Sequence, residues 1–151
     1  MGDLFVFLFF GIVGVFGTYF LHTVNLNWQV LLPASAIGLL SAGVLNVNNM
    51  RDRISDQNAG KMTLAVKFGF ENSKIYHLVI VMSAITLALI FTVMNMSSAY
   101  NWLYLISLPL LFIHLWKIFK TMEAKFFDPQ LKFLVLSTLF FSITFGIGLI
   151  L

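Results

Sequence analysis

The sequence predicts an all-α membrane protein, a single helical domain over residues 1–151 that crosses a bilayer five times. Hydrophobic residues make up 60% of the chain, charged residues only 10%, and the mean hydropathy is +0.94. Soluble domains are typically about 45–50% apolar and about 25% charged. The apolar residues fall into five stretches, each close to the roughly 20 residues that a helix needs to cross the bilayer core.

Small residues mark the packing faces of the first two stretches. The first, residues 4–21, carries Gly11, Gly14 and Gly17 at a spacing of three residues. Small residues along one side of a helix allow another membrane helix to pack closely against it. The second stretch, residues 28–47, is rich in Ala, Ser and Gly. We therefore expect this second helix to be buried among the others rather than to face lipid.

The remaining stretches are predicted at residues 75–94, 102–118 and 133–151. The connection before the last of them contains Asp128-Pro129, which is typical of a helix start. His77 and His114 lie near the ends of the third and fourth stretches, where we expect hydrogen bonds at the membrane interface rather than substrate contacts. The chain has no cysteine, so disulfide and thiolate-metal chemistry are excluded.

The charged residues predict the topology. All nine Lys and Arg residues lie in or next to the second and fourth connections, which five spans place on one side of the membrane. Positively charged connections stay in the cytoplasm. We therefore expect a multi-pass protein of the inner (cytoplasmic) membrane, with the N-terminus and the motif loop 48–74 cytoplasmic. At the opposite boundary, an aromatic belt is predicted from Trp28, Tyr100, Trp102 and Tyr104.

The most polar passage of the chain is residues 48–63, called the motif segment below. If the second helix continues through it, Asn48, Asn49, Asp52 and Asp56 share one face, within an arc of about 100°. Two carboxylates and two amides on one face at a membrane boundary are costly unless a cation meets them.

A flexible turn with a cation, Gly60-Lys61, follows within five residues of Asp56. Carboxylates for a hard cation beside a lysine for phosphate suit a diphosphate substrate, because Mg²⁺ uses only one or two protein carboxylates and takes its other ligands from phosphate and water. A solvated cytoplasmic loop and a cation-binding transporter half remain alternatives. A P-loop is excluded because Ser55 stands where its first glycine is required. Nucleic-acid binding is not expected, since the basic residues are interleaved with acids.

One passage resembles a known motif. Asn48-Asn49-x-x-Asp52-x-x-x-Asp56 followed by Ala59-Gly60-Lys61-x-Thr63-Leu64-Ala65-Val66 resembles the second aspartate-rich motif of the UbiA-type intramembrane aromatic prenyltransferases, closest to their menaquinone branch. In the first stretch, Asp3-Leu4-Phe5-Val6-Phe7 and Gly17-Thr18-Tyr19 are also similar to that branch. Members have nine spans and two such motifs. The resemblance therefore implies the C-terminal five spans of a nine-helix bundle, whose N-terminal half, with the first motif, is missing here.

The resemblance also implies a reaction. It is the Mg²⁺-dependent transfer of a polyprenyl group from polyprenyl diphosphate to 1,4-dihydroxy-2-naphthoate, with loss of CO₂, to give demethylmenaquinone. Other aromatic acceptors, namely 4-hydroxybenzoate, homogentisate or chlorophyllide, stay open, because selectivity depends partly on the missing half. Activity of this chain without that half is not expected.

The same resemblance assigns roles to individual residues. Asp52 and Asp56 match the catalytic metal carboxylates of the family motif. Asn49 stands where many members have a third aspartate, which implies a weaker metal ligand. The implied substrate contacts are Lys61, which matches the diphosphate-binding lysine, together with Arg51 and Asn48.

Overall fold

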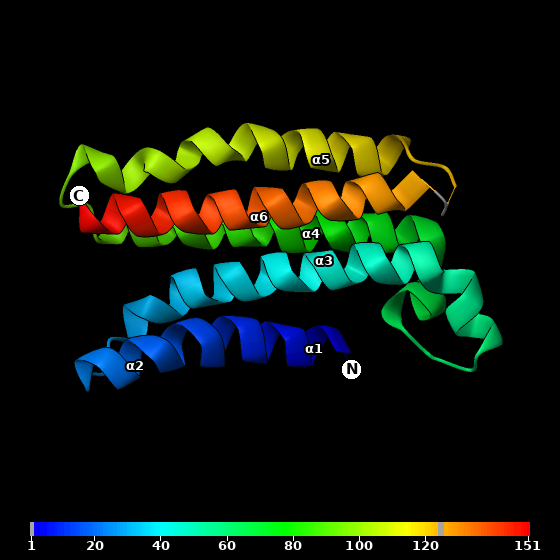
Figure 1. The fold of residues 1–151 in the computed structure, drawn as a ribbon, viewed down its shortest axis with the longest axis horizontal. Coiled ribbons are helices and arrows are strands. Elements are labelled where there is room, and N and C mark those ends of the chain that lie inside the picture. The colour runs from blue at the N-terminus through cyan, green and yellow to red at the C-terminus, as the bar shows by residue number, and fades with distance from the viewer. Residues whose placement is uncertain (1, 124–125) are drawn as a thin grey trace.

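The computed structural model describes residues 2–123 and 126–151. Within this part of the chain, five helical segments are long and apolar enough to cross a membrane: Gly2–Thr23, Trp28–Asn58, Leu64–Met94, Ala99–Lys120 and Phe127–Ile150. They run alongside one another in a bundle (Figure 1). The predicted all-α membrane fold is confirmed.

The first segment packs on its neighbour through glycine. It consists of α1 (Gly2–Val6), a π-helical stretch η1 (Phe7–Gly17) and α2 (Thr18–Thr23). A Cβ atom on Gly11 would lie 2.6 Å from the carbonyl oxygen of Ala34, and one on Gly38 would lie 2.7 Å from that of Phe7. The two backbones are therefore in contact at this crossing, as small residues permit. Gly14 and Gly17, by contrast, face only their own helix.

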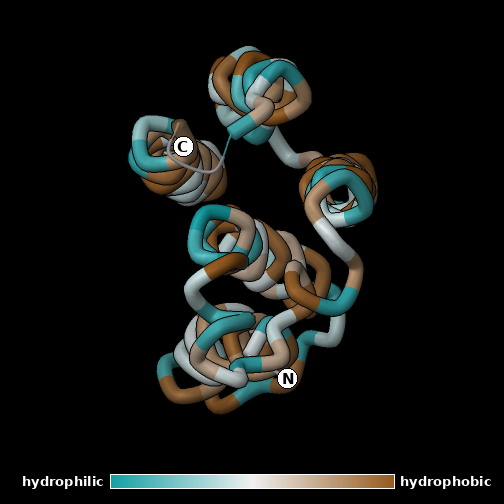
Figure 2. The backbone as a smooth tube through the Cα atoms, turned by 90° about the vertical axis from the view of Figure 1, so that its right-hand side faces the viewer, coloured by the Kyte–Doolittle hydropathy of each residue, from teal (hydrophilic) through white to brown (hydrophobic). Residues whose placement is uncertain are grey.

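The second segment is the centre of the bundle. It begins with η2 (Trp28–Val30) and continues as α3 (Leu31–Asn58), which contacts α1, η1, α4 and α6. Half of its most apolar window is buried, against 6% for the first segment. The N-terminal segment lies along one edge of the bundle in both views (Figures 1 and 2). The prediction that the second helix is buried among others is confirmed.

The third segment, α4 (Leu64–Met94), begins eleven residues before the predicted start at residue 75. Thr63 caps it, because its hydroxyl accepts a hydrogen bond from the backbone N–H of Val66 at 3.3 Å. Gly69 has a φ of 78°, which favours glycine, and the helix changes direction there. Residues 48–74 thus form two helix ends around a short turn (Figure 1) rather than one long loop.

The last two segments complete the bundle. They are η3 (Ala99–Ser107), which continues directly into α5 (Leu108–Lys120), and α6 (Phe127–Ile150). In Figure 1 the N-terminus, the turn after α3 and the connection from α5 to α6 lie at the same end of the bundle. The charged connections are therefore on one side, as five spans require, although Lys125 lies outside the described residues.

The aromatic-belt prediction is wrong for Tyr104. Trp28 and Tyr100 are 66% and 56% exposed, as a belt requires, whereas Tyr104 is fully buried. Its oxygen accepts a hydrogen bond from the Thr92 hydroxyl at 3.2 Å, and its ring packs edge-on against Phe141. A buried tyrosine needs such a partner for its polar atom, and Thr92 on the neighbouring helix supplies it.

The two histidines pair inside the bundle. His77 on α4 and His114 on α5 are fully buried, with their Nε2 atoms 2.9 Å apart. Gly43 of α3 faces the first ring, and a Cβ there would lie in ordinary van der Waals contact, 3.5 Å from His77 Cε1. Phe133 of α6 stacks on the second ring. The two histidines thus form a hydrogen bond, as expected, and they form it with each other between α4 and α5.

Candidate functional site

The end of α3 carries the predicted site residues. The helix continues through Asn58, so the condition for a shared polar face is met. The four residues form two adjacent strips. Asn49 and Asp56 are buried, with 7% and 8% of their surface exposed, whereas Asn48 and Asp52 are only partly buried. The two aspartates are one helical turn apart, about 6 Å along the axis.

Arg51 joins the partly buried strip into one hydrogen-bonded cluster. Its Nε donates to Oδ1 of Asp52 and its Nη2 donates to Oδ2, both at 2.8 Å. This two-pronged geometry is the strongest form of an arginine–carboxylate pair. The Nη2 atom also donates to Oδ1 of Asn48 at 2.8 Å, while Asn48 Nδ2 donates to Asp52 Oδ2 at 3.3 Å. Three of the predicted site residues therefore form one cluster.

A fourth member of this cluster was not predicted. Nη1 of Arg51 donates to Oδ1 of Asp128, in the first turn of α6, at 2.7 Å. The two residues are 77 positions apart in the sequence. Asp128-Pro129 indicated only a helix start, and no local spacing reveals which distant side chain an acid will meet.

Lys61 and Asp56 form a second, separate pair. Lys61 Nζ donates to Oδ1 of Asp56 at 3.3 Å. The backbone brings them together, because Gly60 has a φ of 73° and the N–H of Lys61 donates to the Asp56 carbonyl at 2.8 Å. With the bond from Gly60 N–H to the Gln57 carbonyl at 3.1 Å, this is a Schellman cap. The turn is thus a defined helix end rather than the flexible link predicted.

The donor set suits a magnesium ion that brings its own phosphate ligands. Among the described residues there is no group of three or more His, Asp or Glu side chains that could enclose a metal. Mg²⁺ commonly uses one or two carboxylates and completes its shell with phosphate and water, a role that Asp52 and Asp56 fit. Oδ2 of Asp52 accepts bonds from Arg51 and Asn48, whereas Oδ1 accepts one bond from Arg51 and keeps a second lone pair for a metal.

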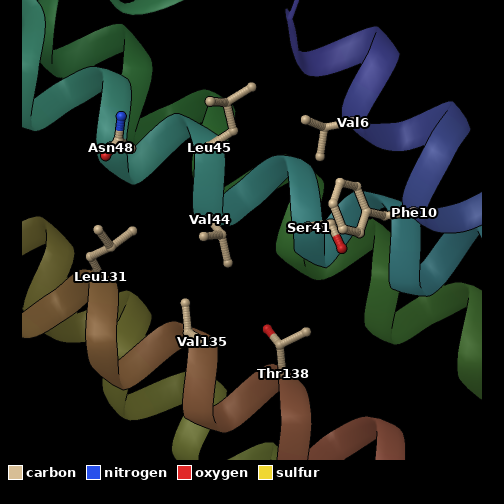
Figure 3. A pocket seen from close by; sticks show the side chains of 9 residues that line it. All are labelled: Val6, Phe10, Ser41, Val44, Leu45, Asn48, Leu131, Val135 and Thr138. Carbon is tan, nitrogen blue, oxygen red and sulfur yellow. The ribbon is translucent and has the colours of Figure 1, made fainter.

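An apolar cavity of about 450 Å³ opens beside this cluster. It lies between the first segment, α3 and α6, with Asn48 at one end and the hydroxyls of Ser41 and Thr138 toward the other (Figure 3). Its lining residues come from those elements: Val6, Phe10, Ser41, Val44, Leu45, Asn48, Leu131, Val135 and Thr138. The Arg51 cluster beside an apolar cavity can bind a molecule that has an anionic head group and an apolar tail.

Comparison with known proteins identifies relatives of this chain. A profile of the UbiA prenyltransferase family matches residues 1–143. The chain is 37% identical over 150 residues to the 1,4-dihydroxy-2-naphthoate octaprenyltransferase of Haemophilus influenzae, covering 99% of this chain and 49% of that protein. It is 34% identical over 151 residues to the Escherichia coli protein of the same name, covering 100% of this chain and 49% of the relative.

A shorter match reaches the 1,4-dihydroxy-2-naphthoate octaprenyltransferase of Mycobacterium tuberculosis, at 47% identity over 68 residues, 45% of this chain and 23% of that protein. The chain spans about half the length of the two relatives that match it from end to end. No solved structure matches it.

Proposed function

The chain belongs to the UbiA prenyltransferase family, and on that premise we propose that it forms part of a membrane enzyme of menaquinone biosynthesis. The reaction is transfer of a polyprenyl group from polyprenyl diphosphate to 1,4-dihydroxy-2-naphthoate. One observation carries the proposal: Asn48, which lines an apolar cavity, bonds to Asp52 and Arg51, and the second acid–cation pair, Asp56 with Lys61, follows on the same helix end. The family match favours prenyl transfer over cation transport.

Asp52 and Asp56 are the residues that would hold Mg²⁺, with Asn49 on the buried strip as a weaker oxygen ligand. When bound, the ion neutralises charge on the diphosphate leaving group. Carboxylate and amide oxygens are the ligands that a hard cation prefers. Holding them one helical turn apart on a regular helix fixes their spacing before the substrate arrives.

Lys61, Arg51 and Asn48 contact the diphosphate in this proposal. The Lys61 side chain is 68% exposed, so its ammonium group can leave Asp56 for an incoming phosphate at small cost. The guanidinium of Arg51 has the planar fork that fits a phosphate as well as a carboxylate. Asn48 lines the cavity and bonds to Arg51, and so stands between head group and tail.

The cavity beside Asn48 takes the prenyl chain and excludes water from its reactive carbon. The bond between this carbon and the diphosphate oxygen breaks, and its electron pair leaves with diphosphate. The ring carbon that bears the carboxylate attacks the allylic carbon. CO₂ then leaves, and the electrons of the ring–carboxylate bond restore the aromatic system. The products are demethylmenaquinol, the hydroquinone form of demethylmenaquinone, together with CO₂ and diphosphate.

The chain spans about half the length of these relatives, so the other half of their length has no counterpart among these 151 residues. We propose that activity requires this other half, and that the half also contributes to the choice between 1,4-dihydroxy-2-naphthoate and acceptors such as 4-hydroxybenzoate. The assembled protein lies in the inner membrane with the motif segment and the N-terminus of this chain in the cytoplasm.

A chimaera tests the proposal. This chain is joined to the part of the Haemophilus influenzae relative that it does not align with, and prenylated product is measured in membranes by mass spectrometry. Asp52→Asn or Asp56→Asn should lower Mg²⁺-dependent turnover by on the order of 100-fold or more, the scale seen when a group that stabilises developing charge is lost. Glu123→Gln, which removes an exposed acid on the same side of the bundle, is the control. Near-normal turnover in either aspartate variant would reject the site.

A further inference from the structure

The donors of Arg51 are almost fully used. An arginine has five N–H groups, and four bonds leave this one: two to Asp52, one to Asn48 and one to Asp128. The two bonds to Asp52 come from Nε and one N–H of Nη2, along one edge of the fork, and the bond to Asn48 comes from the other N–H of Nη2. The bond to Asp128 comes from Nη1, which takes no part in that edge.

This division matters because Asp52 and the diphosphate would compete for the Nε–Nη2 edge of Arg51. Asp52 is needed for Mg²⁺, and the Nε–Nη2 edge of Arg51 is needed for the diphosphate, yet in this structure each is bonded to the other. When substrate binds, the edge must leave Asp52. A long side chain with no other partner would then lose its position. Asp128 keeps a bond to Nη1 that this exchange does not break.

We propose that Asp128 is a positioning residue, which holds the Arg51 guanidinium beside the cavity while the Nε–Nη2 edge exchanges Asp52 for oxygens of the prenyl diphosphate. The inference rests on the proposed function and extends it to a second helix. The exchange keeps the same two-bond geometry at Arg51, because one pair of parallel N–H groups can bind either a carboxylate or a phosphate. It also leaves Asp52 available as a carboxylate for the metal.

The place of Asp128 on α6 supports this role. It precedes Leu131, Val135 and Thr138 at spacings of three, four and three residues, so all four lie on one helix face. The last three line the cavity. The face of α6 that walls the cavity therefore continues into the carboxylate that anchors Arg51. A negative charge in the first turn of a helix is also favourable.

Kinetics of the chimaera test the inference. Asp128→Asn should raise KM for the prenyl diphosphate about fivefold, the upper end for an ion pair whose acid is 64% exposed, and leave KM for the acceptor within about twofold. Asp128→Glu should restore much of the loss. A merely structural role would instead lower the active fraction and therefore kcat, without this split. Glu123→Gln again serves as the control.

A double-mutant cycle is the sharper test. If Asp128 acts through Arg51, adding Asp128→Asn to Arg51→Ala should cause no further rise in KM. Equal effects of Asp128→Asn with and without Arg51, or an unchanged KM in the single variant, would overturn the inference.

A binding measurement separates this inference from the proposed function. The chimaera in lipid nanodiscs is titrated with inorganic diphosphate in the presence of Mg²⁺, and the dissociation constant should rise about fivefold in Asp128→Asn. Equal binding overturns the role of Asp128 whether or not the chimaera turns over. A chimaera that binds normally but forms no prenylated product overturns the proposed function and leaves Asp128 as a phosphate-site anchor.

Discussion

The two acid–cation pairs at the end of α3 are built differently. Arg51 and Asp52 share two bonds of 2.8 Å, are each about one-third exposed or less, and are tied to α6 by Asp128. Lys61 and Asp56 share one bond of 3.3 Å, and the lysine is 68% exposed while its acid is 11% exposed. One pair is fixed by tertiary structure and the other by a local turn.

The difference between the two pairs suggests different roles for Arg51 and Lys61 in the proposed site. A cation that is held from two helices presents its donors in one place, which suits orientation of a substrate. A cation on a long exposed side chain can move several ångströms at little cost, which suits capture of one. Both acids lie on the same regular helix, so in the proposed function the two cations would serve one metal position.

Removal of the fixed cation should have the largest effect on stability. Arg51→Ala deletes four hydrogen bonds and leaves Asp52 and Asp128 near each other without their shared partner. We expect the free energy of unfolding to fall by about 1.5–3 kcal/mol. Chemical denaturation of the chain in detergent micelles measures this. A loss no larger than that of Lys61→Ala would contradict the proposed difference between the pairs.

Distortion of the local turn should have a smaller effect. Gly60→Ala has open space around the new Cβ but must keep a φ of 73°, which costs about 1 kcal/mol in the same denaturation measurement. Gly146→Ala is the matched control, because that glycine also has nothing within 4 Å of a Cβ but lies in regular helix. It should be neutral or slightly stabilising. Equal effects of the two substitutions would show that the cap does not constrain the turn.

Removal of the mobile cation should barely change stability. Lys61→Ala should lower the free energy of unfolding by less than about 0.5 kcal/mol, since a largely exposed ion pair contributes little. In the chimaera it should weaken the dependence of rate on prenyl diphosphate, and Lys61→Arg should retain most of it. Unchanged donor dependence in Lys61→Ala would remove this residue from the site.

The fold could be predicted because its signals are local. Hydropathy over about 20 residues identifies a membrane-spanning helix whatever its neighbours are. The small residues of the second stretch let other helices pack closely around it, as a central helix requires. The start of α4 was misplaced, since Lys67, Glu71 and Lys74 interrupt the apolar pattern although the backbone there is helical. Tyr104 was misplaced for the opposite reason: its type favours the interface, but Thr92 gives it a partner inside.

The site was predictable only along α3. Helical periodicity places Asn48, Asp52 and Asp56 together because their relation is fixed by the helix itself. Asp128 could not be found in this way, since its contact with Arg51 depends on how α6 packs beside α3. The shape of the turn at Gly60 also depends on backbone angles that a glycine permits but does not specify.

The histidine contact between α4 and α5 ties two sequence positions to each other. A bond between two Nε2 atoms requires one ring to donate and the other to accept, so His77 and His114 must be opposite tautomers. Replacing one ring by leucine leaves the Nε2 atom of the other ring buried without its partner. Replacing both rings removes donor and acceptor together and lowers the free energy of unfolding far less. Among related sequences, the two histidines should therefore occur together or be absent together, and one should seldom occur without the other.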